Sequence, residues 1–562
     1  MTHFLPTECI QKIFAYLYED IPSLHSGVLV CRHWCRSIVP ILWRQTLHLE
    51  LSKTNPRIIP AYLPFLTEES LASCGIIRRQ KDKKQLPFFD YPCYLRQMDY
   101  SILYECICAW WNSINDQSEY VIIRSNQIGG GGICGNGCEN GCADDIDSQH
   151  GHENGDRKPI CRRRADAEDE GANEAYGKAL LAKELCKLFV SSCKSFGCLH
   201  LETLPLKEQL EKALFRIPVE FLSIPDFPGA SECLANLAAF ECSGDYDKQQ
   251  IFTGMASICK DLKILTADGI DYGKDASSAL ATLLSKQRGL EYFLLSRCLT
   301  DPSRILSALK SSELTLKSLQ FSSCHFPHDD SLKPISSCVH IDTLRMNQCG
   351  FLTNEMFSSI KNTTFPNLAY LDFTYTFAPT YSFIEVFRRS HSSLREICLG
   401  GIHEHSPDIV SGVAEYCHNV TVFEVTVQRD GIHKLPMLLR NCHQLEVVRL
   451  YGDLNSWTGF LNASEMIGEV GDIVPLKMRE MVIVTNWAVS AAGLSKFFQK
   501  CRAFLSNMTV HCFDHTLDIK PYTDAITEYV KRHGMDVKCL SCRLEDRLLE
   551  FTYRSTSSDD RK

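Results

Sequence analysis

A recurring pattern of apolar residues, Leu-x-x-Leu-x-Leu or a close variant, constrains the fold of this chain more than any other feature. Successive copies begin 25 to 28 residues apart, with one step of 33. This spacing leaves room for one strand, one helix and two connections in each copy. A strand cannot cover its inner face alone, so neighbouring copies must stack into a curved solenoid. The copies begin at Leu237, Leu262, Leu290, Leu316, Ile341, Leu368, Leu394, Val420, Leu445, Met478 and Leu505.

The stretches between copies favour helices: 381–389 and 409–416 each have one apolar face. We expect an earlier copy at Phe196, with Leu199 and Leu201, and a degenerate copy at Val219, with Leu222 and Ile224. A strand–helix unit of this length is typical of leucine-rich repeats.

Cysteine recurs in register with the copies. It lies three positions before the first apolar residue at Cys193, Cys259, Cys338, Cys417 and Cys442, and eight positions after it at Cys298, Cys324 and Cys349. A small, weakly polar side chain can be buried there without a charged partner. The placement resembles the cysteine-containing subtype of leucine-rich repeat. These thiols are therefore expected to be packing residues.

The first 48 residues carry a second, helical pattern. Ile10, Ile13, Phe14 and Leu17 recur at the spacing of one helix face, and Pro6 stands where a missing amide hydrogen costs least. Two further helices are expected, with apolar residues at Leu24, Val28, Cys31, Val39, Leu42 and Trp43. A segment this short buries too little surface to hide so many large side chains, so some of them need a partner.

The order Leu5-Pro6, Glu8, Ile13-Phe14, Leu17, Val30-Cys31-Arg32, Trp34 and Leu42-Trp43 resembles an F-box, the helical segment that docks substrate receptors onto the Skp-type adaptor of cullin ubiquitin ligases. Cys9 replaces a usual aliphatic residue, and the loop at 19–22 is slightly longer than the common form. The amino-acid sequence of the segment looks most like that of the F-box families of filamentous and mycorrhizal fungi. An ordinary helical cap is the alternative. The resemblance implies adaptor binding by Leu5, Pro6, Ile10, Ile13, Phe14, Leu17, Trp34, Leu42 and Trp43.

Together these patterns predict an α/β fold class: a three-helix F-box followed by a leucine-rich-repeat solenoid with a parallel concave sheet and convex helices. The expected organisation is an F-box at 1–48, a mostly helical bridge at 49–125, a disordered insert at 126–177, the solenoid at 178–554 and a disordered tail at 555–562. In the bridge, Ile102, Leu103, Cys106 and Trp110 are spaced for one helix face. The insert is rich in Gly, Asn and acidic residues and cannot repay the entropy of ordering.

The chain totals narrow the classes of function. A net charge of −9 over 562 residues leaves no strongly basic domain, which argues against nucleic acid as the main partner. The N-terminus lacks the basic and apolar regions of a signal peptide, and no apolar run approaches the roughly 20 residues of a membrane span. The 28 cysteines are then best interpreted as reduced thiols in the cytoplasm or nucleus.

The predicted insert holds three motifs with a possible chemical role. Cys134, Cys138 and Cys142, with His150, His152 and Cys161, could supply zinc ligands, but the Gly-Asn-Gly surroundings offer no rigid support. Gly130, Gly132 and Gly135 fit a phosphate cradle that lacks the helix it requires. Arg157, Lys158 and 162–164 could form a nuclear-import signal, although a solvated charge cluster is the simpler interpretation. We therefore expect no metal and no cofactor.

Side chains between the buried residues of each strand should point to the concave surface of the solenoid. Tyr and Arg are favoured at protein interfaces, and charges of both signs suit a protein better than a polyanion. The residues expected to contact a target protein are Tyr292, Arg345, Asn347, Tyr370, Asp372, Glu424, Arg449 and Tyr451. A generic solvated sheet face remains the alternative for each of them.

The resemblance implies a substrate receptor of an SCF-type cullin-RING ubiquitin ligase, which binds the Skp-type adaptor and through it the cullin and RING subunits. Such a receptor acts by proximity, so no catalytic residue is expected. A scaffold that uses the F-box in an unrelated assembly is a second hypothesis. An enzyme or metal sensor centred on the insert is a third.

Overall fold

The computed structural model describes residues 6–47, 55–79, 86–115, 118–123, 160–202, 218–270, 275–401, 407–452, 460–513, 518–545 and 548–554. The chain divides into two compact units, Met1–Leu237 and Ala238–Lys562, which we call unit 1 and unit 2 and describe separately.

Unit 1 begins with the three predicted helices, α1 (Thr7–Ala15), α2 (Ile21–Val28) and α3 (Arg32–Leu42). Pro6 precedes the first turn of α1, as expected. The carboxylate of Asp20 accepts a hydrogen bond from the Ser23 amide at 3.1 Å and so caps α2. The thiol of Cys31 accepts one from the Trp34 amide at 3.5 Å at the start of α3. Side-chain capping therefore marks the starts of α2 and α3, and Pro6 marks the start of α1.

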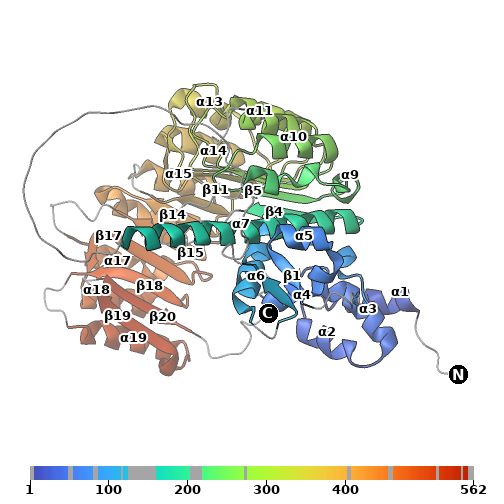
Figure 1. The fold of residues 1–562 in the computed structure, drawn as a ribbon. Coiled ribbons are helices and arrows are strands. Elements are labelled where there is room, and N and C mark those ends of the chain that lie inside the picture. Colours follow the sequence, from blue (N-terminus) through green and yellow to red (C-terminus); the bar gives the residue numbers. More distant parts are fainter. Residues whose placement is uncertain are drawn as a thin grey trace, which may run out of the picture. The chain divides into compact units, whose positions relative to one another are not determined.

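The rest of unit 1 packs around two longer helices. In α6 (Tyr100–Ser113) the predicted face of Ile102, Leu103, Cys106 and Trp110 is buried. Helix α7 (Ile160–Ser192) contacts α6 and crosses Figure 1 as a long teal ribbon. The remaining elements are α4 (Ile59–Tyr62), α5 (Glu68–Ser73), β1 (Ile76–Arg78) antiparallel to β3 (Tyr120–Ile122), β2 (Gln97–Asp99) parallel to β4 (Cys198–Glu202), α8 (Val219–Leu222) and α9 (Ala230–Cys233).

Unit 1 differs from the sequence-based expectation in two places. The chain is helical from Ile160, within the stretch predicted as an insert, while 124–159 lie outside the described residues. The predicted repeat copy at Val219 is wrong, because this segment is the helix α8 and not a strand. Pro218 and Pro225 flank the segment, and proline cannot donate to a strand ladder. The copy at Phe196 is confirmed by strand β4.

Unit 2 contains one strand for each predicted copy from Leu237 onward, and each strand begins two residues after the first apolar residue of its copy. Each strand pairs in parallel with the next, with one register shift, between Ile483 and Ala488 in the pairing of the last two strands. The strands are β5 (Ala239–Ser243), β6 (Ile264–Asp268), β7 (Tyr292–Ser296), β8 (Ser318–Ser322), β9 (Thr343–Asn347), β11 (Tyr370–Asp372), β13 (Glu396–Leu399), β14 (Val422–Thr426), β15 (Val447–Tyr451), β17 (Glu480–Val489) and β18 (Asn507–Cys512).

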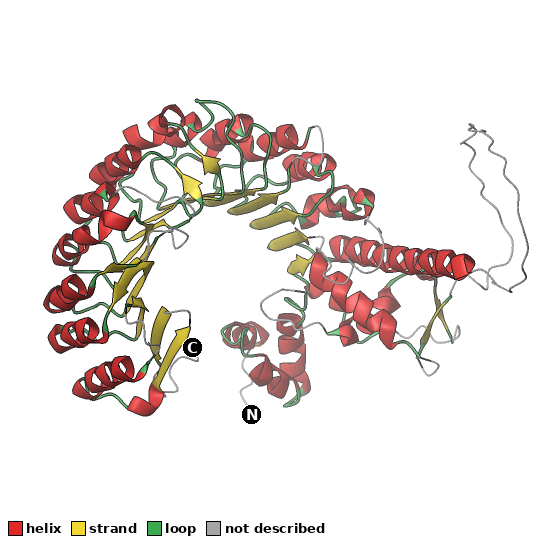
Figure 2. Cartoon of the chain, turned by 90° about the vertical axis from the view of Figure 1, so that its left-hand side faces the viewer, coloured by secondary structure: helices red, strands yellow, loops and turns green. Residues whose placement is uncertain are grey.

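Helices cover the outer face of this sheet, while the strands line the inner, concave face (Figure 2). The predicted helices at 381–389 and 409–416 are confirmed as α14 (Thr380–Ser390) and α15 (Asp408–Tyr416). The others are α10 (Gln249–Ile258), α11 (Ala276–Ser285), α12 (Ser303–Ala308), α13 (Asn354–Asn362), α16 (Leu435–Asn441), α17 (Ser464–Val470), α18 (Ala491–Lys500) and α19 (Lys520–Arg532). The predicted solenoid architecture is therefore present in unit 2.

The unit 2 core lies between the sheet and the helices. Along most strands buried and half-buried residues alternate, as the pattern predicted. One buried row runs across adjacent strands through Leu319, Leu344, Leu371, Ile397 and Phe423, all fully buried. The periodic cysteines are buried as well, which confirms their interpretation as packing residues.

Four non-glycine residues just beyond the strands have a left-handed backbone: Arg297, Ser323, Gln348 and Tyr375, with φ between 48° and 55°. The backbone amides of these residues extend the hydrogen bonding between parallel strands by one residue. Arg297 N donates to Ser322 O at 2.8 Å, and Gln348 N donates to Thr374 O at 3.0 Å. At Arg297, Ser323 and Gln348 this conformation turns the chain from the end of its strand toward the cysteine that follows directly, Cys298, Cys324 or Cys349.

The C-terminal end of unit 2 departs from the parallel pattern. Strand β20 (Leu548–Tyr553) pairs antiparallel with β18, and β19 (Leu540–Glu545) pairs antiparallel with β20. Two short parallel additions lie elsewhere, β10 (Gly350–Phe351) with β12 (Thr376–Phe377), and β16 (Leu461–Asn462) with β17. The antiparallel hairpin covers what would otherwise be the open edge of β18.

No helix in the described part of the chain combines the length and the apolar character needed to cross a bilayer. Within the same described ranges, no group of three or more His, Cys, Asp or Glu side chains is arranged to hold a metal ion. The proposed zinc ligands of the insert, the glycine motif and the basic run lie outside the residues whose side chains are described.

Candidate interaction surfaces

The three N-terminal helices enclose a very small core. It consists of Ile10, Phe14, Leu24 and Ile38, and five half-buried apolar residues of the same helices pack against it. Gly27 permits this packing, because a Cβ atom there would lie 2.6 Å from Cδ1 of Ile38. So small a core leaves other large side chains in solvent.

Six large apolar side chains in and between these helices are exposed. Tyr18 donates its hydroxyl to the Glu19 carboxylate and is set apart from the other five. Ile13 lies in the C-terminal half of α1 and Tyr16 directly follows that helix. Leu29 and Val30 lie in the turn after α2, and Trp34 lies in the first turn of α3. Ile13 is 51% exposed, Leu29 86% and Trp34 36%. We call these five residues the apolar face. Single exposed apolar residues are common, but a group on one small helical segment indicates an interaction site.

The structure separates the residues expected to bind an adaptor into three groups. Ile10 and Phe14 are buried, and Leu17 and Leu42 are half-buried against the same core. Pro6, Ile13 and Trp34 are exposed. Leu5 lies outside the described residues. The exposed group can contact a partner directly, whereas the buried group holds the helices that present it.

Trp43 faces the body of unit 1. Its ring centroid lies 4.0 Å from that of Tyr91 and 5.4 Å from that of Tyr62, which is itself fully buried. The Arg44 carbonyl accepts a hydrogen bond from the Arg96 amide at 2.9 Å nearby. This residue therefore fastens the three helices to the bridge in the structure.

Tyr16, Leu29 and Val30 were not among the predicted adaptor-binding residues. Tyr16 is not at the helical spacing that relates Ile10, Ile13 and Phe14, so the periodicity of the sequence did not predict a role for it. The exposure of Leu29 and Val30 could have been predicted from the sequence, because an apolar pair in a short turn between helices belongs to no buried helix face.

On the concave face of unit 2, three of the residues expected to bind a target contact one another. Nε of Arg345 lies 3.0 Å from Oδ2 of Asp372, and Nη2 of Arg345 donates to the hydroxyl of Tyr370 at 2.7 Å. The guanidinium also lies over the Tyr370 ring, 5.1 Å from its centroid. Burial and the neighbouring Asp372 carboxylate raise the pKa of Tyr370 to about 12. These side chains are held in place before any partner binds.

A second cluster surrounds Arg449 on β15. Its Nε donates to Oε1 of Glu480 at 2.6 Å, and its Nη1 donates to Oε2 of Glu424 at 3.3 Å. Two carboxylates on one guanidinium leave a local excess of negative charge. Tyr451, half-buried two residues further along β15, borders this cluster on the same face.

Tyr292 and Asn347 complete the predicted set, and both are half-buried on strands β7 and β9. Oδ1 of Asn347 is buried without a hydrogen-bond partner among the described residues.

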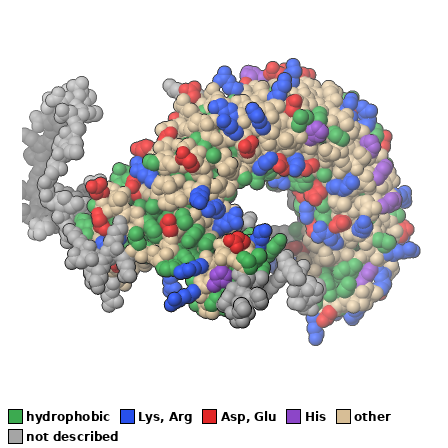
Figure 3. Space-filling view, turned by 90° about the vertical axis from the view of Figure 1, so that its right-hand side faces the viewer, with side chains coloured by type: hydrophobic (Ala, Val, Ile, Leu, Met, Phe, Trp, Pro, Cys, Tyr) green, Lys and Arg blue, Asp and Glu red, His purple; other side chains and the backbone are tan. Residues whose placement is uncertain are grey.

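On the face of the molecule shown in Figure 3, basic and acidic side chains are interspersed and form no field of a single sign. This pattern suits a protein or peptide better than a polyanion.

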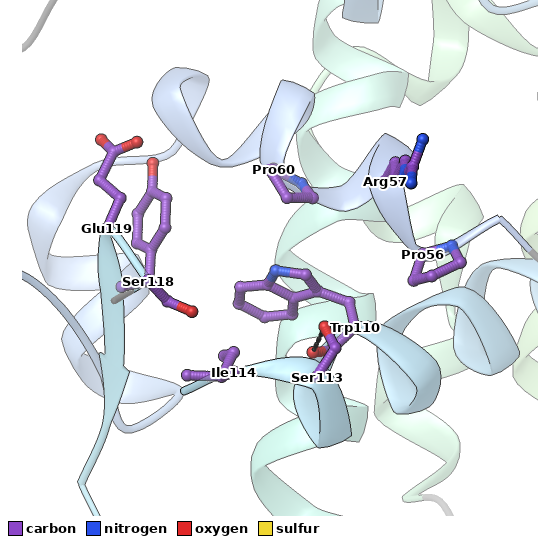
Figure 4. A pocket seen from close by; sticks show the side chains of 9 residues that line it. Pro56, Arg57, Pro60, Trp110, Ser113, Ile114, Ser118 and Glu119 are labelled. Atoms are coloured by element: carbon purple, nitrogen blue, oxygen red, sulfur yellow. Dashed lines mark hydrogen bonds between the residues drawn. The ribbon is translucent and has the colours of Figure 1, made fainter. Parts of the chain in front are cut away.

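Unit 1 also contains a groove of about 400 Å³, which sequence reasoning did not identify. Figure 4 shows the indole of Trp110 between Pro60 and Ile114, with Glu119 at one end and Arg57 at the other. Trp110 and Tyr120 meet edge to face at 6.3 Å. The groove combines an apolar floor with charged ends.

Comparison with protein families finds a match for the N-terminal helices. Residues 2–47 match the F-box-like family. No curated protein matches the sequence. A solved structure of the leucine-rich repeat-containing protein LegL7 from Legionella pneumophila is similar over 53% of this chain and 91% of its own, with 11% sequence identity and a TM-score of 0.29. The repeat assignment rests on the strand register of unit 2 and not on this similarity. The chain thus carries an F-box-like domain at its N-terminus, followed by a leucine-rich-repeat-like region of parallel sheet.

Proposed function

We propose that this protein is the substrate-recognition subunit of an SCF-type cullin-RING ubiquitin ligase. In this role α1–α3 bind a Skp-type adaptor, and through it the cullin and RING subunits, while the concave face of unit 2 binds a target protein. The observation that supports the proposal most is the apolar face on a segment that matches the F-box-like family. A partner that covers these side chains removes apolar surface from water, which is the main driving force of association.

The adaptor contact would centre on Ile13, Leu29 and Trp34. Trp34 also packs edge-on against the buried Phe14, with ring centroids 5.0 Å apart, so its indole is held in place before binding. Rigid aromatic side chains of this kind often carry a large share of binding energy. Tyr16 and Val30 are exposed as well and would add to the contact.

The target contact would use the clusters around Arg345 and Arg449. Because these side chains are already oriented by ion pairs, little conformational entropy is lost when a partner binds. The excess of carboxylates around Arg449 favours a target segment that carries a Lys or Arg side chain. Ubiquitin transfer itself would rely on proximity, with no catalytic residue from this chain. We place the protein in the cytoplasm or nucleus, where its thiols stay reduced.

Adaptor binding can be tested with the full chain and a purified recombinant Skp-type adaptor. The Ile13→Asp, Leu29→Asp double variant should lose binding in isothermal titration calorimetry, because two charges replace exposed apolar side chains at the interface. Leu314→Asp is the matched control, since Leu314 is 74% exposed in unit 2. Circular dichroism should show both variants folded. Unchanged binding by the double variant would contradict adaptor docking through the apolar face.

A ligase role requires more than adaptor binding. With the proteasome blocked, affinity purification of the full chain should recover adaptor, cullin and ubiquitinated target, whereas a chain that starts after His48 should recover the target alone. Recovery of the adaptor without the cullin would contradict the ligase role and favour a scaffold that uses the F-box in another assembly.

A further inference from the structure

A cysteine, a histidine and an aspartate meet on the sheet of unit 1. Strands β2 and β4 pair in parallel, which places Asp99 beside His200 and Gln97 beside Cys198. Burial alternates along β4, so the half-exposed Cys198 and His200 share one face of the sheet. The Asp99 side chain is 2% exposed and that of His200 is 24% exposed. The thiol and the imidazole are therefore accessible to solvent, while the Asp99 carboxylate is buried.

The three groups form a chain of contacts. Sγ of Cys198 lies 2.9 Å from Nε2 of His200. On the other side of the ring, Nδ1 of His200 lies 3.6 Å from Oδ2 of Asp99. A nucleophile within hydrogen-bond reach of a base, with the base oriented by a third group, is the arrangement that activates thiols and hydroxyls in proteins.

The position of Asp99 is fixed by the fold. Its Oδ1 caps α6 by accepting hydrogen bonds from the Ser101 amide at 2.8 Å, the Ser101 hydroxyl at 2.6 Å and the Ile102 amide at 3.2 Å. Oδ2 is thereby left facing His200. Burial alone would raise the pKa of Asp99, but the nearby His200 imidazole and the hydrogen bonds from Ser101 and Ile102 outweigh burial and hold this pKa below its ordinary value. The ionised carboxylate favours a proton on Nδ1, which leaves Nε2 as the acceptor that faces the thiol.

We propose that Cys198 is a nucleophilic thiol that forms covalent adducts with small α,β-unsaturated carbonyl compounds, with His200 as its general base and Asp99 positioning the imidazole. In the first step the Cys198 thiol proton passes to Nε2 of His200, and the thiolate adds to the β-carbon of the electrophile. The new S–C bond moves the π electrons of the C=C bond onto the α-carbon and carbonyl. The imidazolium then returns its proton to the α-carbon, so the product is a neutral thioether and no oxidant or leaving group is required.

This class of electrophile fits better than the alternatives. An acyl transfer would also need two donors placed for an oxyanion, whereas addition to a C=C bond needs only the thiol and its base. A metal would need a third soft ligand in reach, and the described ranges contain no suitable group. Other thiols of unit 1, such as Cys186 and Cys193, are buried and have pKa values raised by that burial, so they are poor nucleophiles. The proposal does not depend on adaptor binding.

The test uses the full chain and N-ethylmaleimide, an α,β-unsaturated imide, with adducts quantified at each cysteine by mass spectrometry. Cys539, half-exposed and without an imidazole partner among the described residues, serves as the internal reference thiol. Cys198 should react about tenfold faster than Cys539 or more, since general-base assistance is worth at least that. Equal rates at the two thiols would overturn the proposal.

Two variants separate activation from a structural effect. His200→Ala should slow the Cys198 reaction by about tenfold while leaving Cys539 unchanged, and free imidazole should restore part of the rate. Asp99→Asn keeps the Oδ1 cap of α6 but replaces the acceptor that faces Nδ1, so it should also slow Cys198 with the circular dichroism spectrum unchanged. A His200→Ala chain that reacts at the wild-type rate, or that imidazole does not rescue, would show that His200 is not the base.

Discussion

The guanidinium of Arg345 and the carboxylate of Asp372 are paired across neighbouring strands β9 and β11, with Nε and Oδ2 3.0 Å apart. Asp372 is nearly fully buried, whereas Arg345 is half-buried. The pair therefore belongs both to the sheet and to the proposed target-binding face. Its contribution to the stability of unit 2 can be measured by substitution, separately from target binding.

Arg345→Met should destabilise unit 2 by about 1–3 kcal/mol, because it leaves a buried carboxylate without its cation. The loss stays below that of a fully buried pair, since Thr374 still donates its amide and hydroxyl to Asp372. Urea denaturation of the full chain, followed by a probe of unit 2, measures the change. Lys317→Met is the control: it breaks a solvent-exposed pair with Glu291 and should leave stability nearly unchanged. Equal effects of the two substitutions would show that burial of Asp372 is unimportant.

Leu371→Ala and Ile397→Ala should each cost about 2–5 kcal/mol, as large-to-small changes in a packed core do. Both side chains are fully buried, and their backbones are paired in register on β11 and β13. The exposed Leu314, replaced by Ala, serves as the control and should change stability by less than about 0.5 kcal/mol. A loss below about 1 kcal/mol at both buried positions would contradict their place in the repeat core.

The stability of unit 2 should depend on pH through Asp268. Burial alone would raise the pKa of this carboxyl, but hydrogen bonds from Arg297 and Ser296 outweigh burial and lower the pKa from its ordinary value of 3.8. A carboxyl with a lowered folded pKa stabilises the protein fully above the unfolded value, and this stabilisation is lost as pH falls through the folded value. The difference in unfolding free energy between wild type and Asp268→Asn should therefore be constant near neutral pH and shrink below about pH 4. A difference that grows on acidification would have the wrong sign.

Trp43→Ala should destabilise unit 1 by about 2–4 kcal/mol, at or below the range for fully buried tryptophans. The expected loss comes from its ring contacts with Tyr62 and Tyr91. Adaptor affinity, measured under conditions where the variant remains folded, should fall much less than for Trp34→Ala. The reverse order of affinities would place Trp43 in the docking surface.

Much of the fold could be predicted because it is locally encoded. The residues after Leu290 or Leu394 alternate between buried and half-buried, since successive side chains of a strand point to opposite faces. The copy at Val219 failed because three apolar residues at suitable spacing fit a short helix equally well. The antiparallel hairpin of β19 and β20 has no repeat pattern, so the sequence did not predict where the parallel part of the sheet ends.

The sequence by itself determined the strand–helix period of unit 2, the face of each strand that is buried and the three-helix N-terminus, because these depend on spacing within about 30 residues. Only the tertiary structure decided that Trp43 turns inward while Leu29 stays in solvent, and that Asp99 lies beside His200 a hundred residues further along the chain. The physical reason is that backbone hydrogen bonds between strands are the same whatever the side chains are. Which distant strands pair, and hence which side chains meet, follows from packing of the whole unit.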